Sequence, residues 1–420
     1  MSQNSARGGS GWRREVGRGW PVLIATVLGG ALGAGVFTSF PLGFFMAPLE
    51  AEFGWSRAAI GLASSVFLAG MLILLPVVGW LCDRFGPRLV AITAIVSSSA
   101  VYAALPFVVT SEIWTLYAGY FAVALGGAGT SFVVYSRTIN AWFTDARGFA
   151  LGVMIAGPGV ATALVPFILP PLMEAYGWRA GYLAISGIVL LALPLVVPLL
   201  RDPPERQAAV AVGGHEALGG IAMPEILRTR AFWTMAVAVV LGSAALAASI
   251  VHLVPMYRDM GASSLQTQFA VSALGVSMIV SRPLVGFLLD RLHPPAVAAA
   301  CLAMTALALA IASNMGPGFI LIFAIALGLG LSAEGDVLAF LCSRFFGLRA
   351  YGAAYGWLYA AATLGYVAGP VLAGIAYTSH GGYDLARQIA AGLCIVSAAL
   401  IFSLGLGDSR APLGLRPKRT

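Results

Sequence analysis

The chain consists of long apolar segments that alternate with short polar connections. Twelve of these segments have about 20 residues or more, which is enough to cross a membrane. Six precede and six follow the longest polar stretch, residues 201–230, which is rich in Pro, Gly and charged residues. The pattern predicts an all-α membrane protein of twelve transmembrane helices in two six-helix bundles. The predicted spans are 20–46, 58–81, 89–109, 113–137, 148–172, 179–200, 231–255, 267–289, 295–314, 317–342, 351–377 and 385–407.

Composition supports this prediction and excludes several other classes of protein. Hydrophobic residues make up 59% of the chain and charged residues 10%, with a mean hydropathy of +0.90, whereas a soluble domain has about 25% charged residues. The four cysteines lie inside apolar segments without a Cys-x-x-Cys spacing, so we expect no disulfide framework and no metal site. The sequence contains no nucleotide-binding loop and no nucleophile–histidine set, so we expect neither an enzyme nor a cofactor.

The basic residues are distributed unevenly among the connections. With both termini and the even-numbered connections assigned to the cytoplasm, that side holds 19 of the 24 Lys and Arg residues and the opposite side holds 4. Cytoplasmic connections are rich in Lys and Arg, so we expect both termini in the cytoplasm and no nucleic-acid partner for the net charge of +7. The predicted parts are a cytoplasmic tail 1–19, an N-terminal bundle 20–200, a cytoplasmic linker 201–230, a C-terminal bundle 231–407 and a cytoplasmic tail 408–420.

The two halves of the chain repeat each other weakly. The segment "GWLCDRFGPR" (79–88) returns as "GFLLDRLHPP" (286–295) at an offset of 207 residues, and further short matches follow in the same order. Six helices repeated in the same orientation predict two bundles related by an axis along the membrane normal, with a substrate site between them.

The first copy of this repeat resembles the signature loop of the major facilitator superfamily. It reads Gly79-x-Leu81-x-Asp83-Arg84-x-Gly86-x-Arg88 and connects the second and third spans. The resemblance implies that Asp83 meets the N-terminus of the eleventh span and closes the cytoplasmic side, while the glycines let helices approach closely. We interpret Arg137, at the end of the fourth span, as a further gating charge. The predicted gating residues are therefore Gly79, Asp83, Arg84, Gly86, Arg88 and Arg137.

A narrower resemblance points to carriers of organic acids. The segment "NAWFTDARGFALGVMIAGPGVATALVP" (140–166) and the motif Arg282-Pro283-x-x-Gly286 resemble the monocarboxylate and oxalate/formate branch of the superfamily, and residues 333–356 resemble its bacterial members. In that branch an arginine of the eighth span contacts the substrate carboxylate, and Arg282 matches it. Met278 stands where the animal carriers have an acidic residue one turn earlier.

Arg282 needs a physical explanation in any case. It lies eight residues before Asp290, about 12 Å into the span at 1.5 Å per residue. A charge at the centre of a membrane helix costs at least about 2.5–3.5 kcal/mol on insertion scales. Arg282 must therefore face a water-filled cavity or a counter-charge. It is either a fork that binds a substrate carboxylate or a structural ion-pair partner.

Glu334 and Asp336 of the tenth span are the candidate counter-charges and proton carriers. They are two residues apart and point to different faces of the helix, so we expect one of them to reach the cavity. The alternative is that both pack against polar groups. His252 is a further proton candidate or an interfacial histidine. Candidate cavity-lining residues, each with helix packing as the alternative, are Thr130, Tyr135, Tyr355 and Tyr359.

Together these observations predict a secondary transporter. We expect a monomer of the bacterial inner membrane that moves a small organic anion, a monocarboxylate, by alternating access with proton symport or exchange. One alternative is proton-coupled efflux of apolar or cationic compounds, with Glu334 or Asp336 as the binding residue. A membrane-embedded ligand sensor is the alternative from another class.

Overall fold

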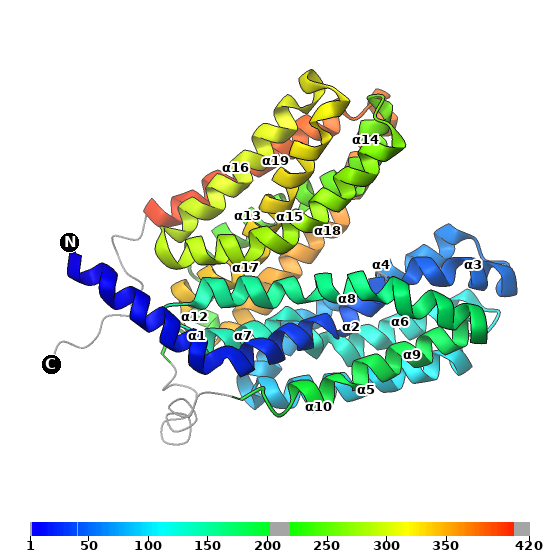
Figure 1. Cartoon of the computed structure of the whole chain (residues 1–420), viewed down its shortest axis with the longest axis horizontal. Coiled ribbons are helices and arrows are strands. Elements are labelled where there is room, and N and C mark those ends of the chain that lie inside the picture. Colours follow the sequence, from blue (N-terminus) through cyan, green and yellow to red (C-terminus); the bar gives the residue numbers. More distant parts are fainter. Residues whose placement is uncertain (1, 40, 202–218, 407–420) are drawn as a thin grey trace.

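A computed structural model describes residues 2–39, 41–201 and 219–406, with the side chains of residues 2–10 and of some helical positions, Asp336 among them, left undescribed. The described chain is almost entirely helical, and it contains no strand apart from an isolated bridge between Gly220 and Gly347. Helices α1 to α10 form one bundle and α13 to α19 form the other (Figure 1). The predicted division into two helical halves therefore matches the arrangement in space.

The N-terminal bundle contains α1 (Ser2–Ala31), α2 (Ala34–Ser39), α3 (Leu42–Phe53), α4 (Arg57–Phe85), α5 (Pro87–Val108), α6 (Ile113–Gly127), α7 (Phe132–Trp142), α8 (Arg147–Tyr176), α9 (Trp178–Leu190) and α10 (Ala192–Val196). The short α12 (Met223–Ile226) precedes the C-terminal bundle. That bundle contains α13 (Arg230–Val251), α14 (Leu253–Asp259), α15 (Ser264–Arg291), α16 (Pro294–Met315), α17 (Ile320–Phe346), α18 (Tyr351–His380) and α19 (Asp384–Leu406).

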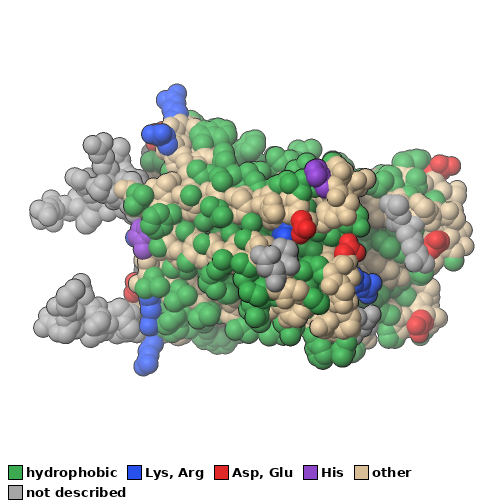
Figure 2. Space-filling model, turned by 90° about the horizontal axis from the view of Figure 1, so that it is seen from above, with side chains coloured by type: hydrophobic (Ala, Val, Ile, Leu, Met, Phe, Trp, Pro, Cys, Tyr) green, Lys and Arg blue, Asp and Glu red, His purple; other side chains and the backbone are tan. Residues whose placement is uncertain are grey.

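The outer surface of the bundles suits a membrane. Among the described residues, 11 helical segments are long and apolar enough to cross one, and the 30-residue α8 occupies the place of the remaining predicted span. Large apolar side chains lie exposed along the helices; Phe107 and Phe167, for example, are 78% and 79% exposed. Figure 2 shows hydrophobic side chains over much of one face, with charged side chains at its left end and scattered over its right half. The chain is a multi-pass membrane protein.

Four predicted spans are interrupted where the sequence pattern showed one continuous segment. The first breaks between α1 and α2, the fourth at Ala128–Thr130, the sixth between α9 and α10, and the seventh at His252. At the first break, the Thr130 hydroxyl accepts a hydrogen bond from Ala34 N (2.9 Å) and Tyr102 donates one to Ala34 O (3.0 Å). These side chains bond backbone groups at the break, where an apolar environment offers no water as a partner.

The segment predicted as an N-terminal tail is helical. Residues 2–19 belong to α1, which continues into the first span. The side chains of Trp12 and Val16 pack against the core of the protein. The helix therefore extends beyond the apolar segment because one of its faces is covered by protein.

The two bundles meet at the end that holds both chain termini and diverge towards the opposite end (Figure 1). At the closed end α4 packs against α18, and α8 packs against α15. Glycines allow each contact: a Cβ added at Gly79 would overlap Gly352 O, and one added at Gly148 would overlap Gly286 O. We call this region the closed end.

A pair of glycine substitutions should separate packing within a bundle from packing between bundles. A Cβ at Gly369 would overlap Ala244 O inside the C-terminal bundle, so Gly369→Val should lower the stability by about 1–3 kcal/mol and reduce the Tm. Gly79→Val should instead separate the bundles and leave the Tm closer to that of the wild type. Thermal unfolding and the reactivity of a thiol placed at the closed end measure the two effects. Equal loss of Tm in both variants would contradict this distinction.

Candidate functional site

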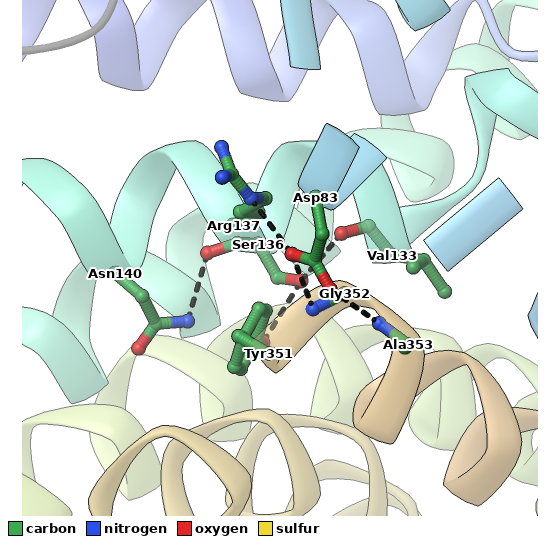
Figure 3. Close-up of polar contacts among 8 residues, drawn as sticks. All are labelled: Asp83, Val133, Ser136, Arg137, Asn140, Tyr351, Gly352 and Ala353. Carbon is green, nitrogen blue, oxygen red and sulfur yellow. Dashed lines mark hydrogen bonds and ion pairs between the residues drawn. The ribbon is translucent and has the colours of Figure 1, made fainter. Parts of the chain in front are cut away.

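Asp83 joins the two bundles at the closed end. Its Oδ1 accepts a hydrogen bond from Gly352 N (2.9 Å) and its Oδ2 accepts one from Ala353 N (2.8 Å), as Figure 3 shows. These amides belong to the first turn of α18, whose own N-cap residue, Ala350, has no side-chain oxygen to offer. A carboxylate from the other bundle therefore caps this helix and faces the positive end of its dipole. The contact expected from the signature loop is present.

Arg137 holds Asp83 in place. Its Nε lies 3.1 Å from Asp83 Oδ1, and both side chains are buried. The neighbouring Ser136 hydroxyl accepts a hydrogen bond from Tyr351 (3.0 Å), a second bond between the bundles (Figure 3). Arg137 therefore lies at the closed end, as the gating interpretation requires, rather than beside Arg282.

The other residues of the loop have different positions. Gly86 connects α4 to α5. Its φ of +84° is a backbone conformation that glycine adopts without steric strain and that other residues rarely adopt. Arg84 is exposed and lies over the rings of Trp80 (5.5 Å) and Phe85 (5.6 Å). Arg88 is also exposed. The loop thus contributes two elements to the interface between the bundles: the Asp83 carboxylate and the close contact of Gly79 with Gly352.

Asp290 forms the equivalent contact on the other side of the closed end. Its Oδ1 accepts from Gly148 N (2.6 Å) and its Oδ2 from Phe149 N (3.0 Å), in the first turn of α8. The N-cap residue of α8, Ala146, likewise has no capping side chain. The sequence analysis did not select Asp290. The signal was present, because Asp290 follows Asp83 at the repeat offset of 207.

Arg282 lies in the middle of α15, on the face that packs against α8. Its side chain is half-buried, and Nη1 donates a hydrogen bond to the carbonyl oxygen of Ile155 (2.5 Å). A Cβ at Gly152 would overlap Arg282 O, so the two helix backbones are close here. Among the carboxylates whose side chains are described, none forms an ion pair with Arg282. The guanidinium therefore lies where the two bundles meet, bonded there to a backbone carbonyl of the other bundle.

Glu334 lies in α17 near Arg282 but is enclosed by its own bundle. It is 8% exposed, and it accepts hydrogen bonds from the hydroxyls of Ser243 and Tyr366, the latter at 3.1 Å. Arg282 is close enough to attract its charge. Glu334 also borders a small cavity of about 20 Å³ whose other walls are mostly apolar. The predicted partner Asp336 lies outside the described side chains.

Arg282 and Glu334 together form what we call the central site. Aromatic residues of α18 connect this site to the closed end. Tyr351, Tyr355 and Tyr359 stack along one face with centroid separations of 5.6 and 5.9 Å. The ring of Tyr359 also meets Phe132 of the other bundle at 6.4 Å, and the charges of Arg282 and Glu334 reach its hydroxyl. Tyr359 thus lies at the central site, whereas Tyr355 is a buried member of the stack.

The remaining candidates are further from this group. Tyr135 is fully buried against Gly29, and its hydroxyl has no hydrogen-bond partner among the described residues. The Thr130 hydroxyl is used at the break of the first span. His252 contacts Tyr383 Oη and Pro370 O, both at 3.1 Å, within the C-terminal bundle.

The sequence analysis missed Tyr366, which contacts Glu334 directly. Tyr366 follows Tyr359 by seven residues, two helical turns, and therefore lies on the same face of α18. This spacing is the signal that could have identified it. Ser243 has no comparable signal in the sequence.

Removing the two carboxylate charges should open the closed end. Asn has the shape of Asp but forms weaker bonds to the helix amides, so Asp83→Asn and Asp290→Asn should each shift the equilibrium by about 1 kcal/mol or more, and the double variant further. Spin-label distances across the closed end measure the shift. Asp259→Asn, an exposed acidic residue of α14, is the matched control. A double variant with the wild-type distance distribution would show that these caps do not hold the bundles together.

Comparisons with known proteins agree with this architecture. A profile of the Major Facilitator Superfamily matches residues 23–261 and 244–420. Monocarboxylate transporter 13 of Bos taurus is 27% identical over 299 residues, which cover 69% of this chain and 66% of that protein. The oxalate:formate antiporter of Oxalobacter formigenes is 27% identical over 285 residues, which cover 66% of this chain and 65% of that protein. The chain thus matches slightly less than two thirds of the length of these relatives.

A solved structure shows the same fold. The human organic anion transporter MFSD10 superimposes with a TM-score of 0.70 at 15% identity, and the match covers 91% of this chain and 99% of that one. These proteins are transporters rather than enzymes, in agreement with the expectation from the sequence. With the family profile matching both halves, the twelve-helix architecture and the signature loop have one explanation: this chain belongs to the major facilitator superfamily.

Proposed function

We propose that this protein is a secondary transporter of a small organic anion, a monocarboxylate, and that Arg282 binds the substrate carboxylate. The observation that carries the proposal is the half-buried guanidinium at the seam of the two bundles, bonded to Ile155 O and to no described carboxylate. The planar fork of a guanidinium matches the geometry of a carboxylate. Relatives named as monocarboxylate transporters and an oxalate:formate antiporter support the substrate class.

Glu334 fits the role of proton carrier better than that of binding residue. It is buried in the C-terminal bundle and bonded to Ser243 and Tyr366, so a cationic substrate would have to displace both hydroxyls. The observation therefore favours an anion carrier over efflux of cations. A carboxylate within reach of Arg282 loses its counter-charge when substrate occupies the guanidinium, and this favours uptake of a proton. Proton symport follows if the substrate and the proton move together, and exchange follows if the empty carrier cannot return.

The way the bundles meet supports alternating access. They are joined at the end where α1 begins and α19 ends, so substrate would reach Arg282 from the opposite end. The excess of basic residues on the termini side supports a cytoplasmic position of that end in a bacterial inner membrane. In this conformation the transporter would take substrate from outside the cell, and breaking the bonds of Asp83 and Asp290 would release it inside.

Two substitutions of Arg282 test the binding role. Arg282→Lys keeps the charge without the fork and should weaken binding of small monocarboxylates moderately, whereas Arg282→Gln should weaken it about ten- to a hundred-fold. Ligand-induced thermal shifts of the purified protein measure the affinity, with the corresponding amides as uncharged control ligands. Arg258→Gln, an exposed arginine of α14, is the matched control variant. Full affinity in a well-folded Arg282→Gln protein would refute the anion-binding role.

Neutralising Glu334 tests proton coupling. Glu334→Gln retains most of the hydrogen bonding to Ser243 and Tyr366 but cannot carry a proton. We expect it to abolish uptake driven by a pH gradient in proteoliposomes and to spare exchange of labelled substrate across the membrane. Asp336→Asn should be examined in parallel, because both residues were candidates. Should both variants keep full pH-driven accumulation, the proton is carried elsewhere.

A further inference from the structure

The part of α1 that directly precedes its apolar stretch forms a surface that none of the preceding contacts explains. We call Trp12–Trp20 the leading segment. It lies at the closed end, before the apolar part of the first span, and its two faces differ sharply. Trp12, Glu15, Val16 and Gly19 share one face, with the spacing i, i+3, i+4 and i+7.

The inner face holds the turn that leads into α8. Glu15 Oε2 accepts hydrogen bonds from three consecutive amides, Thr144 N (3.0 Å), Asp145 N (2.8 Å) and Ala146 N (3.0 Å). A Cβ at Gly19 would overlap the Phe143 ring, so the helix lies directly on this turn. One carboxylate thus satisfies the amides just before the α8 turn that Asp290 caps.

The same face also reaches the other bundle. The Trp12 ring lies 5.2 Å from Phe149 of α8 and 6.4 Å from Phe287 of α15, measured between centroids. Phe149 is also the residue whose amide binds Asp290. Trp12 therefore covers the interface between the bundles beside the helix cap that Asp290 provides. It can contact both rings only while the bundles are together.

The outer face is basic. Arg14 and Arg18 are four residues apart on one side of the helix, Arg14 lies opposite Trp12, and Arg13 flanks them; all three are exposed. Trp20 is 55% exposed. Because exposed tryptophans are enriched at the membrane–water interface, we take Trp20 as the level of that interface. At 1.5 Å per residue, the three arginines lie about 3–11 Å beyond Trp20, within the headgroup layer.

We propose that the leading segment is a clamp whose arginine face binds anionic lipid headgroups, and that this binding stabilises the closed end. Lipid headgroups fit this surface because three exposed cations face outward at headgroup height, while the acidic group nearby, Asp145, lies against Gly11 on the inner side. Opening moves Phe287 away from Phe149 and removes one wall of the Trp12 site. The arginine face would then lose its fixed orientation towards the headgroups, so anionic lipid binds the closed form more strongly.

The experiment measures the conformation and not transport, so its result does not depend on the substrate. Spin labels at Leu89→Cys and Leu292→Cys, exposed positions on different bundles, report the distance across the closed end. In nanodiscs, replacing part of the phosphatidylcholine by phosphatidylglycerol should raise the ratio of closed to open protein about tenfold or more. The triple variant R13Q/R14Q/R18Q should lose most of this response.

Matched variants separate the clamp from general electrostatics. R228Q/R230Q/R344Q removes three exposed arginines of the C-terminal half and should respond to phosphatidylglycerol like the wild type. Glu15→Gln and Trp12→Ala should reduce the closed population in both lipids, and the near-isosteric Glu15→Gln serves if Trp12→Ala does not fold. A triple variant with the full lipid response, or a Glu15→Gln protein with the wild-type distance distribution, would overturn the proposal.

Discussion

Two helix N-termini without caps of their own determine the conformation of this protein. The helices α8 and α18 begin after Ala146 and Ala350, which have no side-chain oxygen for the first-turn amides. Inside a membrane protein such amides need an acceptor. The acceptors are Asp290 and Asp83, each from the opposite bundle. The need of each helix for a cap thereby becomes an attraction between the two halves of the molecule.

Such a connection is strong enough to select a conformation and weak enough to be broken. A helix cap is typically worth about 1 kcal/mol, with up to about 2 in favourable cases, so two caps shift an equilibrium by roughly 30- to 1,000-fold. Glycines at the crossings, Gly79 against Gly352 and Gly148 against Gly286, bring the backbones close without interlocking side chains. The arrangement therefore suits a protein that must alternate between two states.

The sequence predicted the parts of the structure that depend on local pattern. Hydropathy located the spans because membrane helices must be apolar along their length, and the signature loop located the Asp83 contact. The breaks were not predictable, because Ala34 depends on Thr130, 96 residues away. The role of Glu15 could not be predicted for the same reason, because its three amide partners lie about 130 residues further along the chain. Asp290 could have been predicted. It occupies the position of Asp83 in the second copy of the repeat, so the role assigned to Asp83 could have been assigned to Asp290 as well.

The central site and the closed end share the same helix pair, and this suggests how substrate could drive the change of state. Arg282 and Asp290 are eight residues apart on α15, about 12 Å, and both bond to α8. Under the proposed function, a substrate carboxylate competes with Ile155 O for the guanidinium. Binding would then remove one of the bonds between the bundles while the caps of Asp83 and Asp290 remain. Substrate would in this way lower the barrier to opening of the closed end, because one of the bonds between α8 and α15 would already be broken before the caps separate.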